Sequence, residues 1–362
     1  MLDAKDIRHR WLTDHLGWQL TGDEAITVRS ISLSAGEMGP VDRISCAGRS
    51  FVLKGPPPEH STWGALLRDM SMREVQSYRL LGARGPHAPK ISPACYWSEF
   101  DEDGRGALAL EDLGAPQELA QVMAAGLNRS QAAAAVRSLA LAHAAQAATG
   151  ADPLTPPYPW LYTAASEGLV AAVEMGLDDL RRVLPMLLPE PGAGSRAGQI
   201  RDVHVAGVLA QANVDTSCVS ICHGDAWAGN ILFAHGSSAG SLRAFLIDWQ
   251  FTMWGNPLTD IALLLMSSVD AAACASWDDE LLGLYHATLT AHSDIDYPMA
   301  ECRADYRRAQ PFAVLVMLAT LEGYIRGMDE AQLARFTPRV RVAVDRALTS
   351  SVSWGAVSGT RP

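Results

Sequence analysis

Lysine is nearly absent from this chain of 362 residues, which carries 29 basic side chains. Only three of them are lysines, at positions 5, 54 and 90, and the remaining 26 are arginines. An ammonium group is a compact point charge, whereas a guanidinium is a wide planar fork. A position that keeps lysine in such a chain is therefore a candidate for a role that arginine fills poorly. Lys54, which ends the strand-like run 51–54, is the main candidate.

The chain also lacks an excess of positive charge and any long apolar run. Its 40 acidic residues give a formal net charge of -11, and a nucleic-acid partner would need a basic stripe to meet the phosphates. The apolar runs at 261–266 and 312–320 are too short to cross a bilayer. The N-terminus has no apolar core of the signal-peptide type. We therefore expect a cytoplasmic protein with no nucleic-acid or membrane partner.

Closely spaced cysteine pairs are missing as well. The six cysteines are scattered and include no Cys-x-x-Cys spacing. The sequence therefore predicts neither a disulfide framework nor a zinc site.

Two short apolar runs are each followed by an aspartate. The first leads into His223-Gly224-Asp225, with Asn230 five residues after Asp225, and the second into Ile247-Asp248-Trp249. This is the spacing of a kinase catalytic loop, in which an Asp accepts the proton of the substrate hydroxyl and an Asn and a later Asp bind magnesium. A lone His-Gly-Asp is also common turn chemistry. The complete spacing favours the catalytic interpretation.

The residues around both carboxylates carry a resemblance to a known family. Two segments resemble motifs of the aminoglycoside phosphotransferase and choline kinase superfamily. They are His-Gly-Asp-Ala-Trp-Ala-Gly-Asn-Ile-Leu-Phe and Ile-Asp-Trp-Gln. Within the superfamily they are most similar to the ecdysteroid kinase-like branch. That branch has Ile-Asp-Phe-Gln, so this chain differs by having Trp249 in place of the phenylalanine. The resemblance implies an α+β, bilobal protein-kinase-like fold with a small antiparallel β-sheet lobe and a mostly helical lobe.

The pattern along the chain fits two lobes. We expect a nucleotide-binding lobe at 1–113, a helical lobe with the catalytic loop and acceptor site at 114–350, and a loose tail at 351–362. The first lobe should contain a helix over 3–19 and strands at 25–33, 41–46, 50–54, 91–97 and 106–110. The second should contain helices over 130–148, 160–175, 196–212, 276–290, 299–327 and 329–349.

Lys54 lies where a kinase lysine pairs with the α and β phosphates of ATP, although a solvated lysine at a strand end is the ordinary alternative. Its expected partner is Glu74, in the middle of a helix. Ser71-x-x-Glu74 also matches a capping box that opens a helix. The branch carries Glu-Val-x-x-Tyr here, which favours the ion pair.

Two further nucleotide contacts follow from the kinase template. The turn 34–40 lies where a glycine loop covers the phosphates, but Gly36 and Gly39 do not match Gly-x-Gly-x-x-Gly, and an ordinary hairpin turn is equally compatible. Leu110-Glu111-Asp112-Leu113 resembles the family's hinge, whose backbone would meet the adenine edge. A strand exit with Asp112 as a helix cap is the alternative.

Three more residues are expected to support the catalytic loop or the core. The run 255–262 resembles the family's Gly-x-Pro-x-x-Asp-Leu-Ala, in which Asp260 would brace the loop. Stabilisation of a helix N-terminus by its carboxylate is the alternative. His223 should fix the loop through hydrogen bonds, and His143 reads as a buried structural histidine.

Together these residues predict magnesium-dependent transfer of the γ-phosphoryl group of ATP to a hydroxyl of a small molecule. Lys54, oriented by Glu74, would hold the α and β phosphates, Asn230 and Asp248 would hold magnesium, and Asp225 would accept the proton. The loop lacks the Arg of a protein kinase, and no Ala-Pro-Glu follows Asp248, so a protein acceptor fits less well.

The acceptor is left open by the sequence. The branch implies an apolar, steroid- or antibiotic-like acceptor, whereas carboxylates such as 278–280 would suit a cationic aminoglycoside, and aromatic side chains choline or an amino alcohol. A non-catalytic ATP-binding scaffold is a further alternative, which the intact residue set disfavours. A metal-dependent hydrolase using His223 and Asp225 is disfavoured because no second His-rich group is present.

Overall fold

A computed structural model shows a chain that divides into two compact units. The first comprises Met1–Ala115 and Ile247–Phe251, and the second Pro116–Leu246 and Thr252–Pro362. The segment that contains Asp248 thus belongs to the first unit, although its neighbours in sequence belong to the second. The structure describes residues 4–31, 39–58, 64–85, 87–114, 125–180, 187, 199–200, 203–213, 216–235, 242–325 and 328–349. Gly36 of the predicted glycine turn and the predicted tail lie outside these residues.

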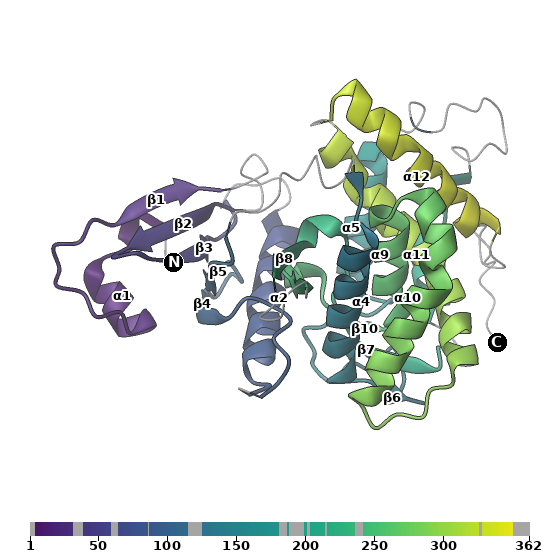
Figure 1. Ribbon diagram of the computed structural model, residues 1–362, viewed down its shortest axis with the longest axis horizontal. Coiled ribbons are helices and arrows are strands. Elements are labelled where there is room, and N and C mark those ends of the chain that lie inside the picture. The colour runs from purple at the N-terminus through teal and green to yellow at the C-terminus, as the bar shows by residue number, and fades with distance from the viewer. Residues whose placement is uncertain are drawn as a thin grey trace. The chain divides into compact units, whose positions relative to one another are not determined.

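The first unit is built on an antiparallel sheet of five strands in the order β1-β2-β3-β5-β4 (Figure 1). A two-residue turn at Ala47-Gly48, both with positive φ, joins β2 to β3, as a tight hairpin requires. β3 pairs with β2 on one side and β5 on the other, and Lys54 lies opposite Leu108. The strands are β1 Thr27–Ser30, β2 Val41–Cys46, β3 Arg49–Lys54, β4 Cys95–Phe100 and β5 Gly106–Glu111.

Two predicted strands of this sheet have different bounds in the structure. β1 covers only part of the expected 25–33, and β4 begins at Cys95 and not at Ile91. Pro93 explains the later start of β4, because proline has no N–H to donate to a ladder.

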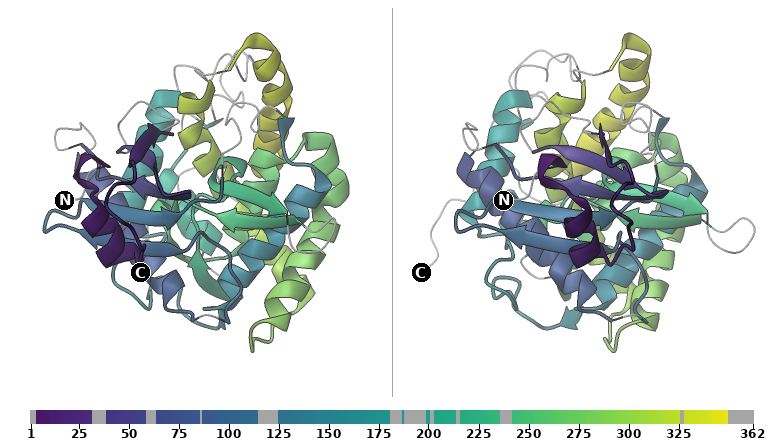
Figure 2. Two further views of the ribbon diagram at one scale, coloured as in Figure 1. Left: turned by 60° about the vertical axis from the view of Figure 1, so that its left-hand side comes forward. Right: turned by 90° about the vertical axis from the view of Figure 1, so that its left-hand side faces the viewer.

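Helices pack against the sheet of the first unit. The predicted helix over 3–19 is shorter: a 3₁₀ turn, η1 (Ala4–Asp6), precedes α1 (His9–Leu16), which ends at Gly17 with φ of 64°. α1 lies over one face of the sheet (Figure 2, right). The core there joins helix and strand residues, namely Ile7, Leu12, Trp18, Ile44, Cys46, Phe51, Leu53 and Ala109.

α2 (Gly64–Gly82) carries Glu74 in its middle. The capping-box alternative for Ser71 is therefore wrong, because the helix has already run for a full turn or more before it. The Ser71 hydroxyl instead accepts from the backbone N–H of Gly106 at 2.8 Å, which ties α2 to the start of β5. The buried positions Leu67, Met70 and Tyr78 give α2 one apolar face.

The second unit contains a three-stranded sheet, a hairpin and most of the helices. β7 (Cys218–Cys222) lies between β6 (Ala148–Thr149) and β10 (Met253–Gly255), and β8 (Ile231–His235) pairs with β9 (Leu242–Leu246). Every residue of α9 (Leu258–Ser268) is buried, so this helix is the centre of the unit. The other helices are α4 Arg129–Ala144, α5 Glu167–Leu180, α8 Val205–Asn213, α10 Ala271–Ala291, α11 Met299–Ile325 and α12 Glu330–Thr349.

The helix predicted over 160–175 begins only at Glu167. The residues before it form turns, and Tyr162 makes a bridge to Met253 of β10 that ties this segment to the sheet. The remaining helices of the second unit overlap their predicted ranges. The predicted α+β fold, a small antiparallel sheet unit followed by a mostly helical unit, is confirmed.

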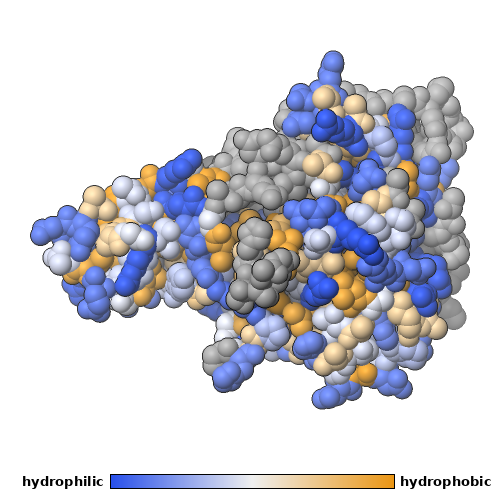
Figure 3. Space-filling model, in the orientation of Figure 1, coloured by the Kyte–Doolittle hydropathy of each residue, from blue (hydrophilic) through white to orange (hydrophobic). Residues whose placement is uncertain are grey.

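No helix within the described ranges is long and apolar enough to cross a membrane. Hydrophilic and hydrophobic residues are interspersed on the face shown in Figure 3. The large apolar side chains that the described residues expose belong to separate elements, and are Val28, Tyr96, Leu154, Met175 and Val342.

Candidate active site

One ammonium group joins three elements of the first unit. Lys54 at the end of β3 lies 2.7 Å from Oε2 of Glu74 on α2 and 2.6 Å from Oδ1 of Asp248. The ion pair of Lys54 with Glu74 that the sequence predicts is present. Asp248 follows β9 in sequence by two residues, so the structure also brings the second predicted carboxylate to the same lysine.

Burial and charge act in opposite directions on this group. Burial opposes the charged form of Lys54, but Asp248 and then Glu74 outweigh that effect, so the pKa of Lys54 is raised. Burial raises the pKa of Glu74 to about 7, although Lys54 counteracts part of the rise. The lysine is therefore held as a cation at neutral pH, while Glu74 changes its ionisation close to neutrality.

The backbone around Asp248 is held in an unusual conformation. Asp248 has φ of 66°, in the left-handed region that residues other than glycine seldom adopt. Its neighbour Trp249 donates from the indole to the hydroxyl of Ser92 at 2.9 Å. The carbonyl of Trp249 accepts from Ser77 of α2 at 3.4 Å. These contacts hold the turn that aims the Asp248 carboxylate at Lys54.

The predicted hinge is tied to the sheet through its side chains. Arg43 of β2 donates to both carboxylate oxygens of Asp112, at 2.7 and 3.0 Å, and to the carbonyl of Gly114 at 2.6 Å. Ser50 donates to the same carboxylate at 2.7 Å. Burial raises the pKa of Asp112, but the bonds from Arg43 and Ser50 outweigh it and leave the pKa lowered.

Glu111, the residue before Asp112, is also engaged. Its carboxylate lies 2.6 Å from the ammonium of Lys90 and accepts from the N–H of Ala94 at 3.0 Å. Leu113 lies in the loop directly after β5. The carboxylates of Glu111 and Asp112 therefore fix the end of β5 and the start of the loop that contains Leu113.

In the second unit, β7 ends at Cys222 and leads into a loop that carries Asp225 and Asn230, both buried. Gly224 has φ of 82°, a conformation that favours glycine and turns the loop sharply. The side-chain nitrogen of Asn230 donates to the carbonyl of Asp225 at 2.9 Å and to its Oδ2 at 2.8 Å. The indole of Trp227 donates to the same Oδ2 at 3.3 Å.

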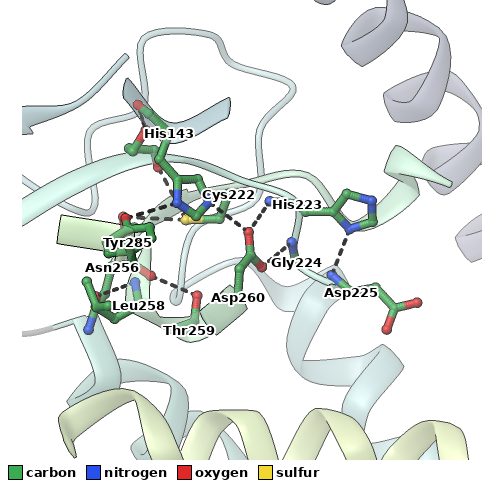
Figure 4. Close-up of polar contacts among 12 residues, drawn as sticks. His143, Cys222, His223, Gly224, Asp225, Asn256, Leu258, Thr259, Asp260 and Tyr285 are labelled. Atoms are coloured by element: carbon green, nitrogen blue, oxygen red, sulfur yellow. Dashed lines mark hydrogen bonds and ion pairs between the residues drawn. The ribbon is translucent and has the colours of Figure 1, made fainter. Parts of the chain in front are cut away.

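Asp260 of α9 holds this loop by its backbone (Figure 4). Its Oδ2 accepts from the N–H of His223 at 2.6 Å, and its Oδ1 from the N–H of Gly224 at 2.9 Å. The ring of His223 in turn accepts from the N–H of Asp225 at 3.3 Å. These are the contacts that the expected bracing by Asp260 and His223 requires.

A second histidine lies on the other side of Asp260. His143 is fully buried, with Nε2 3.0 Å from Oδ2 of Asp260 and Nδ1 3.0 Å from the hydroxyl of Tyr285. Burial raises the pKa of Asp260, but His143 and then His223 outweigh it, so the pKa is lowered and the carboxylate stays ionised. The carboxylate of Asp225 points away from this group (Figure 4).

His143, Cys222 and Asp260 place three possible metal-ligand atoms within 4.8 Å of one another. Each is already hydrogen-bonded: both ring nitrogens, both carboxylate oxygens, and the thiol of Cys222, which donates to the carbonyls of Ser220 and Gly255. Burial also raises the pKa of Cys222 and disfavours the thiolate that metals prefer. The group is a hydrogen-bonded brace for the loop.

The structure thus groups the sequence-predicted residues into two sets. In the first unit, Lys54 contacts Glu74 and Asp248. In the second unit, Asn230 contacts Asp225, and His223 and Asp260 form hydrogen bonds to the backbone of the same loop. No sequence motif predicts the roles of Arg43 and Tyr285. Arg43 is one arginine among 26 in the sequence, and Tyr285 lies in an ordinary helical pattern, so only the fold reveals their partners.

The class of protein-kinase-like phosphotransferases is defined by two features. A sheet unit carries a lysine–glutamate pair, and the helical unit that follows carries an Asp/Asn loop held by hydrogen bonds from a buried helix. A sequence model of the Ecdysteroid kinase-like family matches residues 72–295, more than half of the chain. The chain belongs to this family, and the predicted enzyme class, an ATP-dependent phosphotransferase, is confirmed.

Several solved structures are similar over nearly the whole chain. A Plasmodium vivax ethanolamine kinase is 12% identical, with 94% of this chain and 86% of that chain covered and a TM-score of 0.48. A microcompartment-associated aminopropanol kinase is 13% identical (95% and 98% covered, TM-score 0.47). A GDP complex of wild-type aminoglycoside 2'-phosphotransferase-IIIa is 13% identical (94% and 97% covered, TM-score 0.46). No curated protein matches the chain in sequence.

Proposed function

We propose that this protein transfers the γ-phosphoryl group of ATP to a hydroxyl of a small molecule, with Asp225 as the base. The observation that carries the proposal is the contact of Lys54 with both Glu74 and Asp248. An ammonium has three N–H donors. Two of them face the carboxylates. The third has no further acceptor among the described residues, and it would donate to an oxygen of the α or β phosphate.

The residues proposed for magnesium suit that ion. Magnesium prefers oxygen ligands such as carboxylate and amide oxygens. The side-chain nitrogen of Asn230 is bonded to Asp225, and no bond within the described residues uses its Oδ1. Asp248 presents a carboxylate that is 29% exposed. Asn230 and Asp248 would hold the ion, which supplies positive charge to the phosphates when it is bound.

The chain's own groups account for the proton. The acceptor oxygen forms a bond to the γ-phosphorus while the bond from that phosphorus to the β–γ bridging oxygen breaks, and ADP leaves. The proton of the acceptor hydroxyl passes to the carboxylate of Asp225. Trp227 and Asn230 bond to Oδ2 of this carboxylate, which is 4% exposed as a residue and so largely screened from water.

The pairing of the carboxylates 278–280 gives no support to a cationic acceptor. The three consecutive carboxylates 278–280 on α10, which would suit an aminoglycoside, are each paired with an arginine of a different helix. The pairs are Asp278 with Arg346 on α12, Asp279 with Arg303 on α11, and Glu280 with Arg129 on α4. The family's name points the same way, so we propose an apolar, hydroxylated acceptor of the steroid type.

An ATP-consumption screen tests the proposal. The purified protein, with MgATP, is offered polyhydroxylated steroids, hydroxylated polyketides, aminoglycosides, choline and ethanolamine, with the Asp225→Asn variant as the blank. We expect turnover with a neutral hydroxylated compound and none in the blank. Turnover with an aminoglycoside or an amino alcohol would overturn the acceptor class alone. Turnover in the blank at the parent rate would overturn the role of Asp225. ATP binding without turnover on any compound would favour a scaffold.

A further inference from the structure

The indole of Trp227 is buried against the proposed base. Trp227 is 5% exposed, and its Nε1 donates to Oδ2 of Asp225 at 3.3 Å. A buried indole N–H usually finds a hydrogen-bond partner. Here the partner is a carboxylate only two residues away, which the chain reaches because the N–H of Trp227 also donates to the carbonyl of Asp225 at 3.1 Å.

Two side-chain donors meet the same carboxylate oxygen. The side-chain amide of Asn230 donates to Oδ2 of Asp225 at 2.8 Å, and the indole of Trp227 donates to the same oxygen at 3.3 Å. The terminal torsion of an aspartate is broad and roughly two-fold, so the carboxylate plane is soft unless contacts fix it. Two donors on one oxygen fix the plane and therefore the direction of Oδ1. Such alignment matters for a base, because small displacements from the reactive geometry cost large factors in rate.

Gly229 makes room for this indole. A Cβ built at position 229 would lie 2.0 Å from Cη2 of Trp227 and 2.4 Å from Cζ2, far inside van der Waals contact. The six-membered ring therefore lies directly on the backbone of Gly229. The loop has little freedom to move aside, because the N–H of Ala228 donates to the hydroxyl of Ser268 at 2.8 Å, at the end of the buried helix α9.

We propose that Trp227 is a positioning residue for the carboxylate of Asp225, and that Gly229 is the opening that admits its indole. The consequence for catalysis rests on the proposed function, because it requires Asp225 to be the base. The contact itself does not, and it is tested without turnover.

The contact is tested by the NMR signal of isotope-labelled indole N–H groups. The Trp227→Phe variant identifies the Trp227 signal by its loss. Trp254 provides the matched control, because it is also 5% exposed and donates its indole N–H to the backbone carbonyl of Asp152 at 2.9 Å. In the Asp225→Asn variant a neutral amide replaces the carboxylate. We expect the Trp227 signal to move and the Trp254 signal to stay. A Trp227 signal that does not respond overturns the inference.

The glycine is tested in the same spectrum. In the Gly229→Ala variant the added methyl displaces the indole, and we expect the Trp227 signal to move toward the position of a solvent-exposed indole. The Gly283→Ala variant is the control, because nothing lies within 4 Å of a Cβ at that position. An unchanged Trp227 signal in Gly229→Ala overturns the assigned role of Gly229.

The catalytic consequence is measured with MgATP and the most rapidly phosphorylated acceptor of the screen. We expect Trp227→Phe to lower kcat about tenfold, the effect of losing one hydrogen bond to a charged group, with KM for ATP within about twofold. Trp254→Phe should keep both within about twofold. Parental kcat in Trp227→Phe beside an inactive Asp225→Asn overturns this inference alone. An Asp225→Asn variant that is active at the parent rate overturns the proposed function.

Discussion

The ammonium of Lys54 lies between two carboxylates, 2.7 Å from Glu74 and 2.6 Å from Asp248. The three residues come from β3, from α2 and from the segment after β9. Two carboxylates converge on one ammonium in a largely buried place, so removing the lysine leaves two facing carboxylates without their cation. The stability of the first unit and the proposed binding of nucleotide therefore depend on the same group.

Replacing Lys54 with Met should destabilise the protein by about 3 kcal/mol at pH 8, because it leaves two facing carboxylates without their cation. Much of the loss should be recovered at pH 5, where carboxylates that face one another take up protons. Urea unfolding at both values measures this. Lys90→Met is the matched control: its pair with Glu111 is more open, with the lysine 42% exposed, and should change stability by less than about 1 kcal/mol. Equal losses in the two variants would contradict the account.

Glu74 should make the protein less stable as the pH rises. Its pKa is raised to about 7 in the folded state, above that of an exposed glutamate. The folded state therefore holds a proton that the unfolded state releases, and this contribution to stability is lost as the pH rises toward and through 7. In Glu74→Gln the dependence of the unfolding free energy on pH between 5 and 8 should be flatter than in the parent. An identical slope in both proteins would show that Glu74 does not titrate there.

Arg43 should affect the binding of ATP more than the chemistry. It holds the loop after β5 by bonds to Asp112 and to the carbonyl of Gly114. Arg43→Gln should raise KM for ATP about fivefold to tenfold, because charge-assisted bidentate bonds are lost from the hinge, and leave kcat within about twofold. Arg10→Gln, which removes an exposed pair with Asp14, serves as the control. A larger fall in kcat than rise in KM would contradict the hinge role.

Tyr285 should act on the catalytic loop from a distance. The His143 ring links Tyr285 to Asp260, with Nδ1 3.0 Å from the Tyr285 hydroxyl and Nε2 3.0 Å from Oδ2 of Asp260. Tyr285→Phe should therefore loosen the ring beneath Asp260 and lower kcat about fivefold, with about 1 kcal/mol lost in stability. Tyr297→Phe removes a comparable buried bond, 2.9 Å to Asp305, and should lose stability but not kcat. Equal kcat in the two variants would contradict the coupling.

The sequence predicted most of the charged residues of the proposed site. Asp248 is expected from the spacing of the catalytic motif, Lys54 from its place at a strand end in a chain poor in lysine, and Glu74 from the family resemblance. The structure joins Lys54 with both carboxylates. The interpretation of Ser71 as a cap failed because α2 begins at Gly64, before the apparent motif. A capping box is a local pattern, and the packing of Leu67 and Met70 extends the helix past it.

Other contacts were not predictable because their residues belong to no recognisable motif and their partners are far apart in the chain. Arg43 and Asp112 are separated by 69 residues, and His143 and Tyr285 by 142. Neither Arg43 nor Tyr285 belongs to a motif with fixed spacing. The three carboxylates 278–280 looked like a site for a cation, and only the packing of α10 against three other helices shows that arginines already pair with them.

The central claim is that Asp225 is the base of a phosphoryl transfer while Lys54 and its partners hold the nucleotide. It is tested most directly by comparing Asp225→Asn with the parent in two quantities: the Kd for MgATP by calorimetry, and the single-turnover rate of transfer to the acceptor found in the screen. We predict a Kd within about twofold of the parent and a transfer rate lower by about a thousandfold, within the range for general-base catalysis. A variant that transfers the phosphoryl group at the parent rate would contradict the claim.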